Sequence, residues 1–361
     1  MALSFGRNFD QIHKEALNFL SKLIETPSLS KEEDETADLL ESYLKKNDVE
    51  TFRKGNNVWA RNRFYDSSKQ SIILNSHHDT VKPNKGYTKD PYKAEIQDGK
   101  LFGLGSNDAG GALVSLMFTF LYLHDQEDLN YNLVFAGTAE EEISGHGGVT
   151  SILREIENIS FGIVGEPTEM EMAVAEKGLM VLDCVSTGES GHAARNEGVN
   201  AIYKSLKDIE WFKSFSFPEE SDHLGPVKMS VTMIESGYQH NVVPDTCKFV
   251  VDVRGTDAYS NEEMLAIIRS HVDCEVKERS VRLQPSFVPE GHVLLEVAKE
   301  LDINMFGSPT LSDQALMKFP TVKIGPGLSA RSHSADEFIY VEEIKDGING
   351  YLAILNKILK S

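Results

Sequence analysis

The 361-residue sequence has little of three features that would each indicate a particular class of protein. It contains no uninterrupted apolar run near the ~18 residues that span a membrane. Its first residues, MALSFGRNFDQ, lack the basic and then apolar pattern of a secretory signal. Cysteine is scarce and odd in number, without metal-type spacing: Cys184, Cys247 and Cys274. We therefore expect a cytoplasmic protein with reduced thiols and no disulfide framework.

The sequence also has fewer basic than acidic residues. Lysine and arginine number 36 against 56 aspartates and glutamates, so the formal net charge is −20 at pH 7. A field of this sign repels nucleic acid and anionic membranes, and we expect neither as a partner. The general excess of acid otherwise favours solubility, so small groups of acids must be judged one at a time.

Apolar spacing predicts an alternation of helices and strands in the first part of the chain. Two amphipathic helices are expected within the first ~45 residues, separated by TPSLS. Ser30 followed by Glu33 is a capping-box signature for the second helix. Strand-like runs and a helical run then alternate, which is typical of an α/β sheet: SIILNS, AGGALVSLMFTFLYL, YNLVFAG and FGIVGEPT.

The pattern changes near residue 175. From there to about residue 285 the order is β-α-β-β-α-β, a ferredoxin-like arrangement that forms a self-contained unit. The earlier pattern then resumes and ends in a helix. We predict an α/β fold of two domains, since 361 residues exceed what one core usually accommodates. Residues 1–174 and 286–361 form a domain with a central, mostly parallel sheet, and residues 175–285 form an inserted α+β domain.

Acidic and histidine side chains recur where strands end. In NSHHDT, His77 and Asp79 point to the same face if the strand continues, whereas His78 points the other way. Asp79 could then accept the second N–H of a metal-bound His77 and set its tautomer. Taken alone, such a pair is more often a structural hydrogen bond.

Two further segments carry carboxylates. GLGSNDAGG places Asp108 at the start of a helix, where it would also serve as an ordinary N-cap. FAGTAEEEISG ends an apolar strand with Glu140, Glu141 and Glu142. A divalent cation would let adjacent carboxylates stay ionised, with one of them as ligand and a neighbour as general base. The alternative is a solvated acidic loop.

Two single residues complete the candidate site. Glu166 stands before a proline at a strand end in VGEPT, and His333 lies in a polar loop, SARSHSADEF, where a lone histidine is usually a surface residue. Five of the candidates supply two imidazoles and three carboxylates, a set suited to two divalent ions that share one bridging carboxylate: His77, Asp108, Glu142, Glu166 and His333. Strand ends are also where open α/β sheets place their sites.

Five motifs in this order resemble the dizinc aminoacylase, acetylornithine deacetylase and succinyl-diaminopimelate desuccinylase metallohydrolases, over essentially the whole chain. They are SHHDTVKP, GLGSNDAGG, AEEEISG, GEPT and SHSADE. The resemblance implies a zinc-exopeptidase-like catalytic domain and an inserted lid and dimerisation domain. It assigns roles to seven residues: His77 and Glu166 bind one zinc, Glu142 and His333 bind the other, Asp108 bridges, Glu141 is the general base, and Asp79 orients His77.

The sequence departs from the family pattern in two places. After the bridging aspartate the family often has Met-Lys-Gly, whereas this chain has AGG at 109–111, and the usual Asp-Glu-Glu is here EEE at 140–142. Neither change removes a ligand. The triple glutamate leaves a one-residue choice between base and ligand, and the family's spacing favours Glu141 as base.

The inserted domain carries further family segments. GESGHAA resembles the Gly-His segment whose histidine reaches the active site of the partner subunit. The resemblance therefore implies that His192 stabilises the oxyanion in trans, in a homodimer. It also places Asn241 and Arg254 at the substrate, where Arg254 is suited to hold a carboxylate by two parallel hydrogen bonds. The alternative for Arg254 is an exposed strand residue.

The resemblance implies amide hydrolysis of a small N-acyl amino acid with two Zn²⁺ ions, for which Co²⁺ can substitute. The SPTLSDQAL and KIGPGLSARSH segments resemble the acylornithine branch, which favours N-acetyl-L-ornithine and arginine biosynthesis. An N-succinyl-ornithine, citrulline or diaminopimelate substrate is an alternative, with Arg331 at the extra carboxylate; another is a dipeptidase or aminoacylase. A rival of a different class is a catalytically silent, dimeric metal-binding protein, although here every expected position is occupied.

Overall fold

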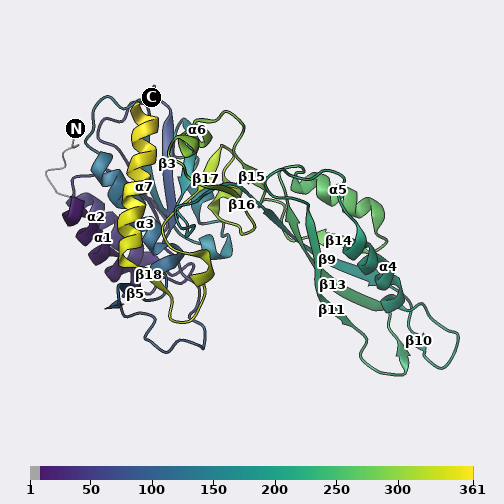
Figure 1. Ribbon diagram of the computed structural model, residues 1–361. Coiled ribbons are helices and arrows are strands. Elements are labelled where there is room, and N and C mark those ends of the chain that lie inside the picture. Colours follow the sequence, from purple (N-terminus) through teal and green to yellow (C-terminus); the bar gives the residue numbers. More distant parts are fainter. Residues whose placement is uncertain (1–8, 361) are drawn as a thin grey trace. The chain divides into compact units, whose positions relative to one another are not determined.

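The computed structural model describes residues 9–360, which form two compact units (Figure 1). The first comprises the chain up to Val174, Val288–Phe306 and the chain from Ser312 onward. The second comprises Ala175–Phe287 and Gly307–Leu311. The predicted insertion, residues 175–285, lies within the second unit, which extends two residues further and gains a short segment from later in the chain. No helix in the described part is both long and apolar enough to cross a membrane.

The largest sheet has nine strands. In sheet order they are β1 (Thr51–Lys54), β2 (Asn57–Arg61), β6 (Asn132–Thr138), β3 (Ser71–His77), β7 (Ile159–Val164), β17 (Thr321–Lys323), β8 (Met172–Glu176) and β15 (Ser286–Phe287), with β16 (Met305–Ser308) also paired to β8. The four central strands, from β6 to β17, are parallel. Every residue of β3 and β6 is buried, as expected for strands covered on both faces. The predicted α/β class is thereby confirmed.

A layer of helices supplies the core on one face of this sheet. The almost fully buried α3 (Gly111–Leu123) contacts β3 and β6 and packs against α1 (Phe9–Ile24) and α7 (Val341–Lys360) (Figure 1). The shorter α6 (Val293–Glu300) also contacts α7, and α2 (Asp34–Lys46) covers β1 and β2. The helices predicted at both ends of the chain are confirmed, since the apolar residues that indicated them are buried.

Short elements complete the first unit. A three-stranded sheet joins β18 (Phe338–Tyr340), β5 (Lys100–Phe102) and β4 (Glu95–Gln97). Single helical turns interrupt the loops: a π-helical turn η1 (Ser106–Gly110) and 3₁₀ turns η2 (Glu141–Ile143), η3 (Val149–Ser151), η4 (Asp313–Leu316) and η5 (Ser329–Arg331). Three of these turns, η1, η2 and η5, carry or flank residues of the candidate site.

The second unit has the predicted β-α-β-β-α-β order. Its elements are β9 (Gly178–Thr187), α4 (Ala201–Ser214), β11 (Lys228–Ser236), β13 (Thr246–Gly255), α5 (Asn261–His271) and β14 (Glu275–Glu278), with a small ribbon of β10 (Gly191–His192) and β12 (Val242–Val243). The antiparallel sheet order is β11-β13-β9-β14. Alternate residues of β9 and β13 are buried, and this buried face packs against α4 and α5.

The predicted capping box of α2 does not form, and this expectation was wrong. α2 begins at Asp34, and Glu33 occupies the N-cap position without capping the helix through its side chain. Ser30 Oγ instead donates to Asp79 Oδ2 at 2.7 Å, and Glu33 Oε1 accepts from Glu140 N at 3.2 Å. Both side chains are used by contacts with distant segments, which override the local signature.

Candidate metal centre

The carboxyl ends of β3, β6 and β7 lie at one edge of the sheet, and each is followed by a candidate ligand. His77 is the last residue of β3 and is 1% exposed. Its Nδ1 lies 3.0 Å from the backbone carbonyl oxygen of Asp79 and 3.4 Å from Asp79 Oδ1. The carbonyl fixes the proton on Nδ1, which leaves Nε2 as the ring atom available to a metal. Asp79 therefore orients His77 mainly through its backbone.

His77 Nε2 faces three carboxylates. The distances are 3.3 Å to Asp108 Oδ1, 3.7 Å to Glu166 Oε1 and 4.0 Å to Glu141 Oε2. Burial acts to lower the pKa of His77, but the hydrogen bonds to Asp108 and Asp79 and the charges of the glutamates outweigh it and raise that pKa well above the ordinary value. The ring thus lies in a strongly cation-attracting environment.

Asp108 lies between the two histidines. Its Oδ1 contacts His77, and its Oδ2 lies 3.4 Å from His333 Nε2. The N-cap alternative does not hold, since α3 begins at Gly111 and Asp108 belongs to the preceding π-helical turn. The carboxylate of Glu337 accepts from the backbone N–H groups of Asn107 (2.8 Å) and Asp108 (3.0 Å), which holds this turn in place.

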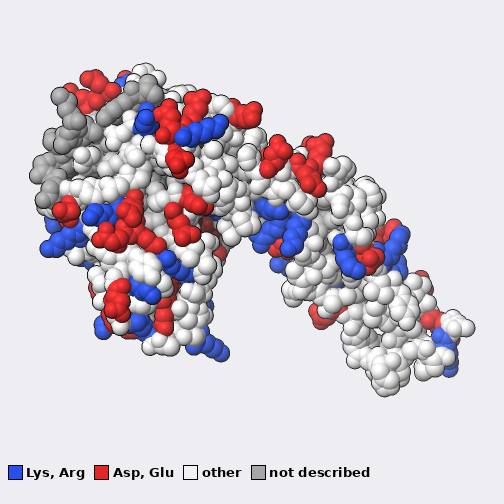
Figure 2. Space-filling view, in the orientation of Figure 1, with Lys and Arg blue, Asp and Glu red and all other residues white. Residues whose placement is uncertain are grey.

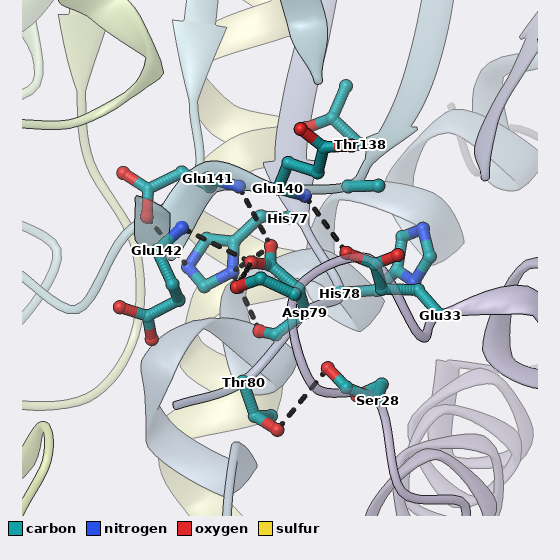
Figure 3. Close-up of polar contacts among 12 residues, drawn as sticks. Ser28, Glu33, His77, His78, Asp79, Thr80, Thr138, Glu140, Glu141 and Glu142 are labelled. Atoms are coloured by element: carbon teal, nitrogen blue, oxygen red, sulfur yellow. Dashed lines mark hydrogen bonds and ion pairs between the residues drawn. The ribbon is translucent and has the colours of Figure 1, made fainter. Parts of the chain in front are cut away.

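The three glutamates after β6 separate into different roles. Glu140 turns its carboxylate back onto its own loop, where Oε2 accepts from Gly147 N at 3.1 Å. A Cβ at Gly145 or Gly147 would lie 1.9 or 2.3 Å from a carboxylate oxygen of Glu140, so a side chain at either position would displace that carboxylate. Glu141 and Glu142 instead lie beside His77 (Figure 3). The solvated-loop alternative therefore does not describe these two residues.

Two overlapping groups could each hold a metal ion. Ligand atoms of His77, Asp108 and Glu142 lie within 4.8 Å of one another, as do those of His77, Glu141 and Glu166. Burial raises the pKa of Glu166 to about 8 and raises that of Glu141 well above its ordinary value. Divalent cations would reverse this penalty by neutralising the crowded carboxylates, so the donor set fits such ions.

His333 approaches the group from a loop that follows β17. Its Nε2 lies 3.0 Å from Glu142 Oε2, and this hydrogen bond raises the pKa of His333 to about 9. The ring is 54% exposed, so it borders the open side of the site. Asn84 Nδ2 donates to the backbone oxygen of His333 at 3.0 Å and helps to support its loop. The five predicted ligands, Glu141 and Asp79 are therefore brought together.

The predicted substrate residues are placed differently. Arg331 Nη1 pairs with Glu343 Oε2 at 2.7 Å, and its guanidinium lies 4.8 Å and 5.0 Å from the ring centres of Phe338 and Tyr340. With its side chain only 14% exposed, Arg331 is engaged within the first unit. These contacts do not favour the predicted role at a succinyl carboxylate.

The other three lie in the second unit. His192 on β10 is exposed, and the backbone oxygen of Asn241 accepts from Ala193 N at 3.0 Å, so His192 and Asn241 are neighbours. Arg254 lies on β13 and not in the ribbon of β10 and β12 beside His192 and Asn241. Its Nε and Nη2 donate to the two carboxylate oxygens of Asp252 at 2.9 Å and 3.2 Å.

Sequence reasoning missed two buried acids near the site. Asp313 accepts from Asn75 Nδ2 at 2.9 Å and Thr138 Oγ1 at 3.0 Å, and burial raises its pKa to about 6. The other is Glu337, which holds the turn of Asp108. Asp313 stands inside SPTLSDQAL, a segment used above only for its resemblance to the acylornithine branch. Glu337 stands inside SHSADEF, where the charged run was an available signal.

Comparison with known proteins decides the family. Residues 73–357 match the profile described as Peptidase family M20/M25/M40. The chain belongs to this family. Its activity class is accordingly that of a metal-dependent amidohydrolase.

Relatives in the M20/M25/M40 family are similar over most of their length. A peptidase M20 domain-containing protein of Schizosaccharomyces pombe is 27% identical over 97% of this chain and 84% of its own. A succinyl-diaminopimelate desuccinylase 2 of a Ruegeria species is 23% identical over 94% and 92%. An acetylornithine deacetylase of Buchnera aphidicola is 24% identical over 81% of each chain. These proteins are similar to this chain, and their low sequence identities do not establish its substrate.

Solved structures show the same fold. The aminopeptidase PepT of Bacillus cereus superposes with a TM-score of 0.76 at 20% identity and covers 96% of this chain and 98% of its own. YXEP of Bacillus subtilis, described as a dinuclear metal-binding peptidase of the M20 family, gives a TM-score of 0.73 at 17% identity and covers 97% and 99%.

Proposed function

We propose that the chain is a zinc-dependent hydrolase that removes the acyl group from an N-acyl amino acid, with N-acetyl-L-ornithine as its substrate in arginine biosynthesis. The observation that carries the hydrolase proposal is the division within the triple glutamate. Glu142 meets His333, Glu141 faces His77 and Glu166, and Glu140 turns away. One carboxylate is thus free to move a proton beside a set of metal ligands.

Two Zn²⁺ ions, or Co²⁺ in their place, are the proposed cofactors. His77 and Glu166 would hold one ion and Glu142 and His333 the other, and Asp108, which lies between the two histidines, would be shared by both. When bound, the ions would polarise the scissile carbonyl and acidify water.

Glu141 is the proposed general base and acid. Its carboxylate would take a proton from the attacking water and return it to the nitrogen of the leaving amine, so that the peptide nitrogen departs as a neutral amine. In the metal-free protein burial raises the pKa of this carboxyl well above its ordinary value, and bound cations would lower it again so that the carboxylate can accept a proton. Asp79 accepts from the Glu141 backbone N–H at 3.0 Å and keeps the residue in place.

The acyl-ornithine substrate is supported by two observations. A similar protein bears the name acetylornithine deacetylase, and the net charge of −20 attracts a substrate with a cationic side chain. In Figure 2 acidic side chains are spread over the face of the first unit. A succinyl substrate is the second candidate, supported by the desuccinylase among the similar proteins. We retain Arg254 as the proposed partner of the substrate carboxylate; Asp252 holds its guanidinium in a two-pronged bond, which would have to open when the substrate binds.

The second unit supports a proposed homodimer. β11 is an edge strand that pairs only with β13 in the described part of the chain. Met233 (64% exposed) and Ile234 (57%) on β11, and Tyr203 (74%) on the neighbouring α4, expose apolar surface. Figure 2 shows a largely uncharged surface at this end of the second unit. An open edge flanked by apolar side chains suits pairing with a second copy. In such a dimer His192 would act on the partner's substrate.

The cytoplasm is the proposed compartment. All three cysteines are free thiols, and two of them are buried. Reduced cysteines fit a compartment that keeps thiols reduced.

The first experiment is a substrate panel. The zinc-loaded protein is given N-acetyl-L-ornithine, N-succinyl-L-ornithine, the corresponding citrulline derivatives and a simple dipeptide at matched concentrations, and amine release is measured. A strong preference for one acyl-ornithine or acyl-citrulline supports the deacylase proposal and identifies the acyl group. Faster dipeptide cleavage would move the protein to a peptidase function, and no hydrolysis of any substrate would favour the catalytically silent alternative.

A further inference from the structure

Two buried carboxylates hold the backbone of the glutamate loop. The N–H of Glu140 donates to Glu33 Oε1 at 3.2 Å. The N–H groups of Glu141 and Glu142 donate to Oδ1 and Oδ2 of Asp79 at 3.0 Å and 3.2 Å (Figure 3). Three consecutive backbone N–H groups of the loop therefore donate to carboxylates that belong to two other segments of the chain. We call Glu33 and Asp79 together the carboxylate clamp.

Glu33 is an unusual member of this clamp. Its side chain is fully buried, and none of the ion pairs among residues 9–360 includes it. Besides Glu140, it accepts from Lys31 N at 2.6 Å and, through Oε2, from Asn56 Nδ2 at 2.9 Å. Burying a carboxylate without a cation is costly unless hydrogen bonds compensate. Glu32 and Glu35 on the same segment are exposed, so burial of Glu33 is a specific feature of this position.

The segment that carries Glu33 is itself fastened to the strand end that carries Asp79. Thr80 N donates to the backbone oxygen of Ser28 at 2.8 Å, and Leu29 forms a parallel bridge with Thr80. Ser30 Oγ donates to Asp79 Oδ2 at 2.7 Å. The two carboxylates are therefore fixed relative to each other by one short stretch that follows α1.

The loop requires such support. Glu140 has φ of 56° and Ser144 has φ of 46°, a left-handed conformation that is unfavourable for residues other than glycine. A shift of this loop by one residue would exchange the roles of three chemically identical side chains. The clamp holds this stretch by its backbone and not by its side chains, so Glu141 and Glu142 remain free for the site.

We infer that Glu33 is a positioning residue, which together with Asp79 sets the loop so that Glu141 faces His77 while Glu142 faces His333. This inference rests on the proposed function insofar as Glu141 is the general base. Glu33 reaches the loop through the Glu140 backbone and not through a proposed ligand.

The test uses three replacements of Glu33 in the full chain. Glu33→Ala removes the acceptor. Glu33→Asp keeps the charge but is one methylene shorter, so it cannot span to Glu140 N. Glu33→Gln keeps one oxygen for the backbone donors, while Asn56 can rotate its amide to accept from the new NH₂ group. Glu35→Gln, at an exposed position in the first turn of α2, is the matched control.

Three experiments are carried out: amide hydrogen exchange of residues 140–142 in the metal-free protein, the visible spectrum of the Co²⁺-loaded protein, and steady-state kinetics for kcat and KM. We expect Glu33→Ala and Glu33→Asp to speed exchange and lower kcat about tenfold with KM within about twofold, since a hydrogen bond to a charged group is worth about that factor or more. The cobalt spectrum should change with them. Glu33→Gln should retain most of kcat, and Glu35→Gln should match the parent.

Unchanged exchange and kcat in Glu33→Asp would overturn the inference, as would an effect confined to KM. If Glu33→Ala does not fold, the aspartate and glutamine variants decide, because both keep a polar group at the site. Exchange and the cobalt spectrum need no substrate. If the parent protein hydrolyses no substrate of the panel, the proposed function is rejected. Hydrogen exchange and the cobalt spectrum would still test the carboxylate clamp in that case.

Discussion

Glu142 and His333 are 191 residues apart in the chain, yet His333 Nε2 lies 3.0 Å from Glu142 Oε2. The contact joins the loop after β6 to the loop after β17. It distinguishes Glu142 from the two identical residues before it, because Glu140 binds its own loop and Glu141 lies on the side of Glu166.

The first prediction concerns metal content. Glu142→Gln should lose one equivalent of bound zinc, because an amide replaces a charged oxygen ligand. Glu140→Gln should keep both equivalents, because its amide oxygen can still accept from Gly147 N. Elemental analysis of the dialysed proteins measures both. Equal zinc loss in the two variants would contradict the assignment of Glu142 as the ligand.

The second prediction concerns the base. Glu141→Gln should retain metal but lower kcat by about 10²-fold or more, because glutamine cannot accept a proton from water. Zinc content and steady-state kinetics are compared with the parent protein. Full activity in this variant would reject Glu141 as the base.

The third prediction concerns protons released on metal binding. In the metal-free protein the pKa values of Glu166 and His333 are raised to about 8 and about 9, so both groups hold a proton at pH 7. Metal ligands must be deprotonated, so zinc binding should release protons and tighten as pH rises from about 6 towards 9. Titration calorimetry in buffers of different ionisation enthalpy gives the number of protons. Affinity that is independent of pH over this range would be inconsistent with these residues as ligands.

The fourth prediction separates a structural from a substrate role for Arg331. Its bonds to Glu343 and its place over Phe338 and Tyr340 lead us to expect that Arg331→Ala lowers the free energy of unfolding by about 1–3 kcal/mol. The kcat/KM ratio between acetyl and succinyl substrates should stay the same. Urea unfolding and paired kinetics test both parts. A selective loss of desuccinylation would restore the substrate role.

The fifth prediction concerns self-association. Ile234→Asp places a charge on the exposed edge strand β11 and should convert the proposed dimer to a monomer. Ile96→Asp, at a similarly exposed apolar position on β4, is the control and should leave the mass unchanged. Light scattering during gel filtration measures the mass. A parent protein that is monomeric at micromolar concentration would reject the dimer and, with it, the role of His192 in trans.

Much of the fold could be predicted from local patterns in the sequence. The apolar spacing of α1, the uninterrupted apolar runs of β3 and β6, and the order of elements in the second unit all follow from interactions between residues near one another in the chain. The five motifs place His77, Asp108, Glu142, Glu166 and His333 at strand ends or in loops, and an α/β sheet of parallel strands gathers such ends at one edge.

The same local signals failed where a side chain is used by a distant segment. Ser30 and Glu33 have the spacing of a capping box, but their partners are Asp79 and Glu140. A true capping box does form at α5, where Ser260 and Glu263 bind each other and each other's backbone N–H groups.

By itself the sequence determined the class of fold, the set of residues that meet at the metal centre and the chemistry that such a set can support. Only the tertiary structure decided which of three identical glutamates faces which partner, that Arg331 is bound to Glu343, and that Asp313 and Glu337 are buried beside the site. The physical reason is that spacing along the chain records which face of a helix or strand a residue occupies, whereas these roles depend on contacts between segments that meet only after folding.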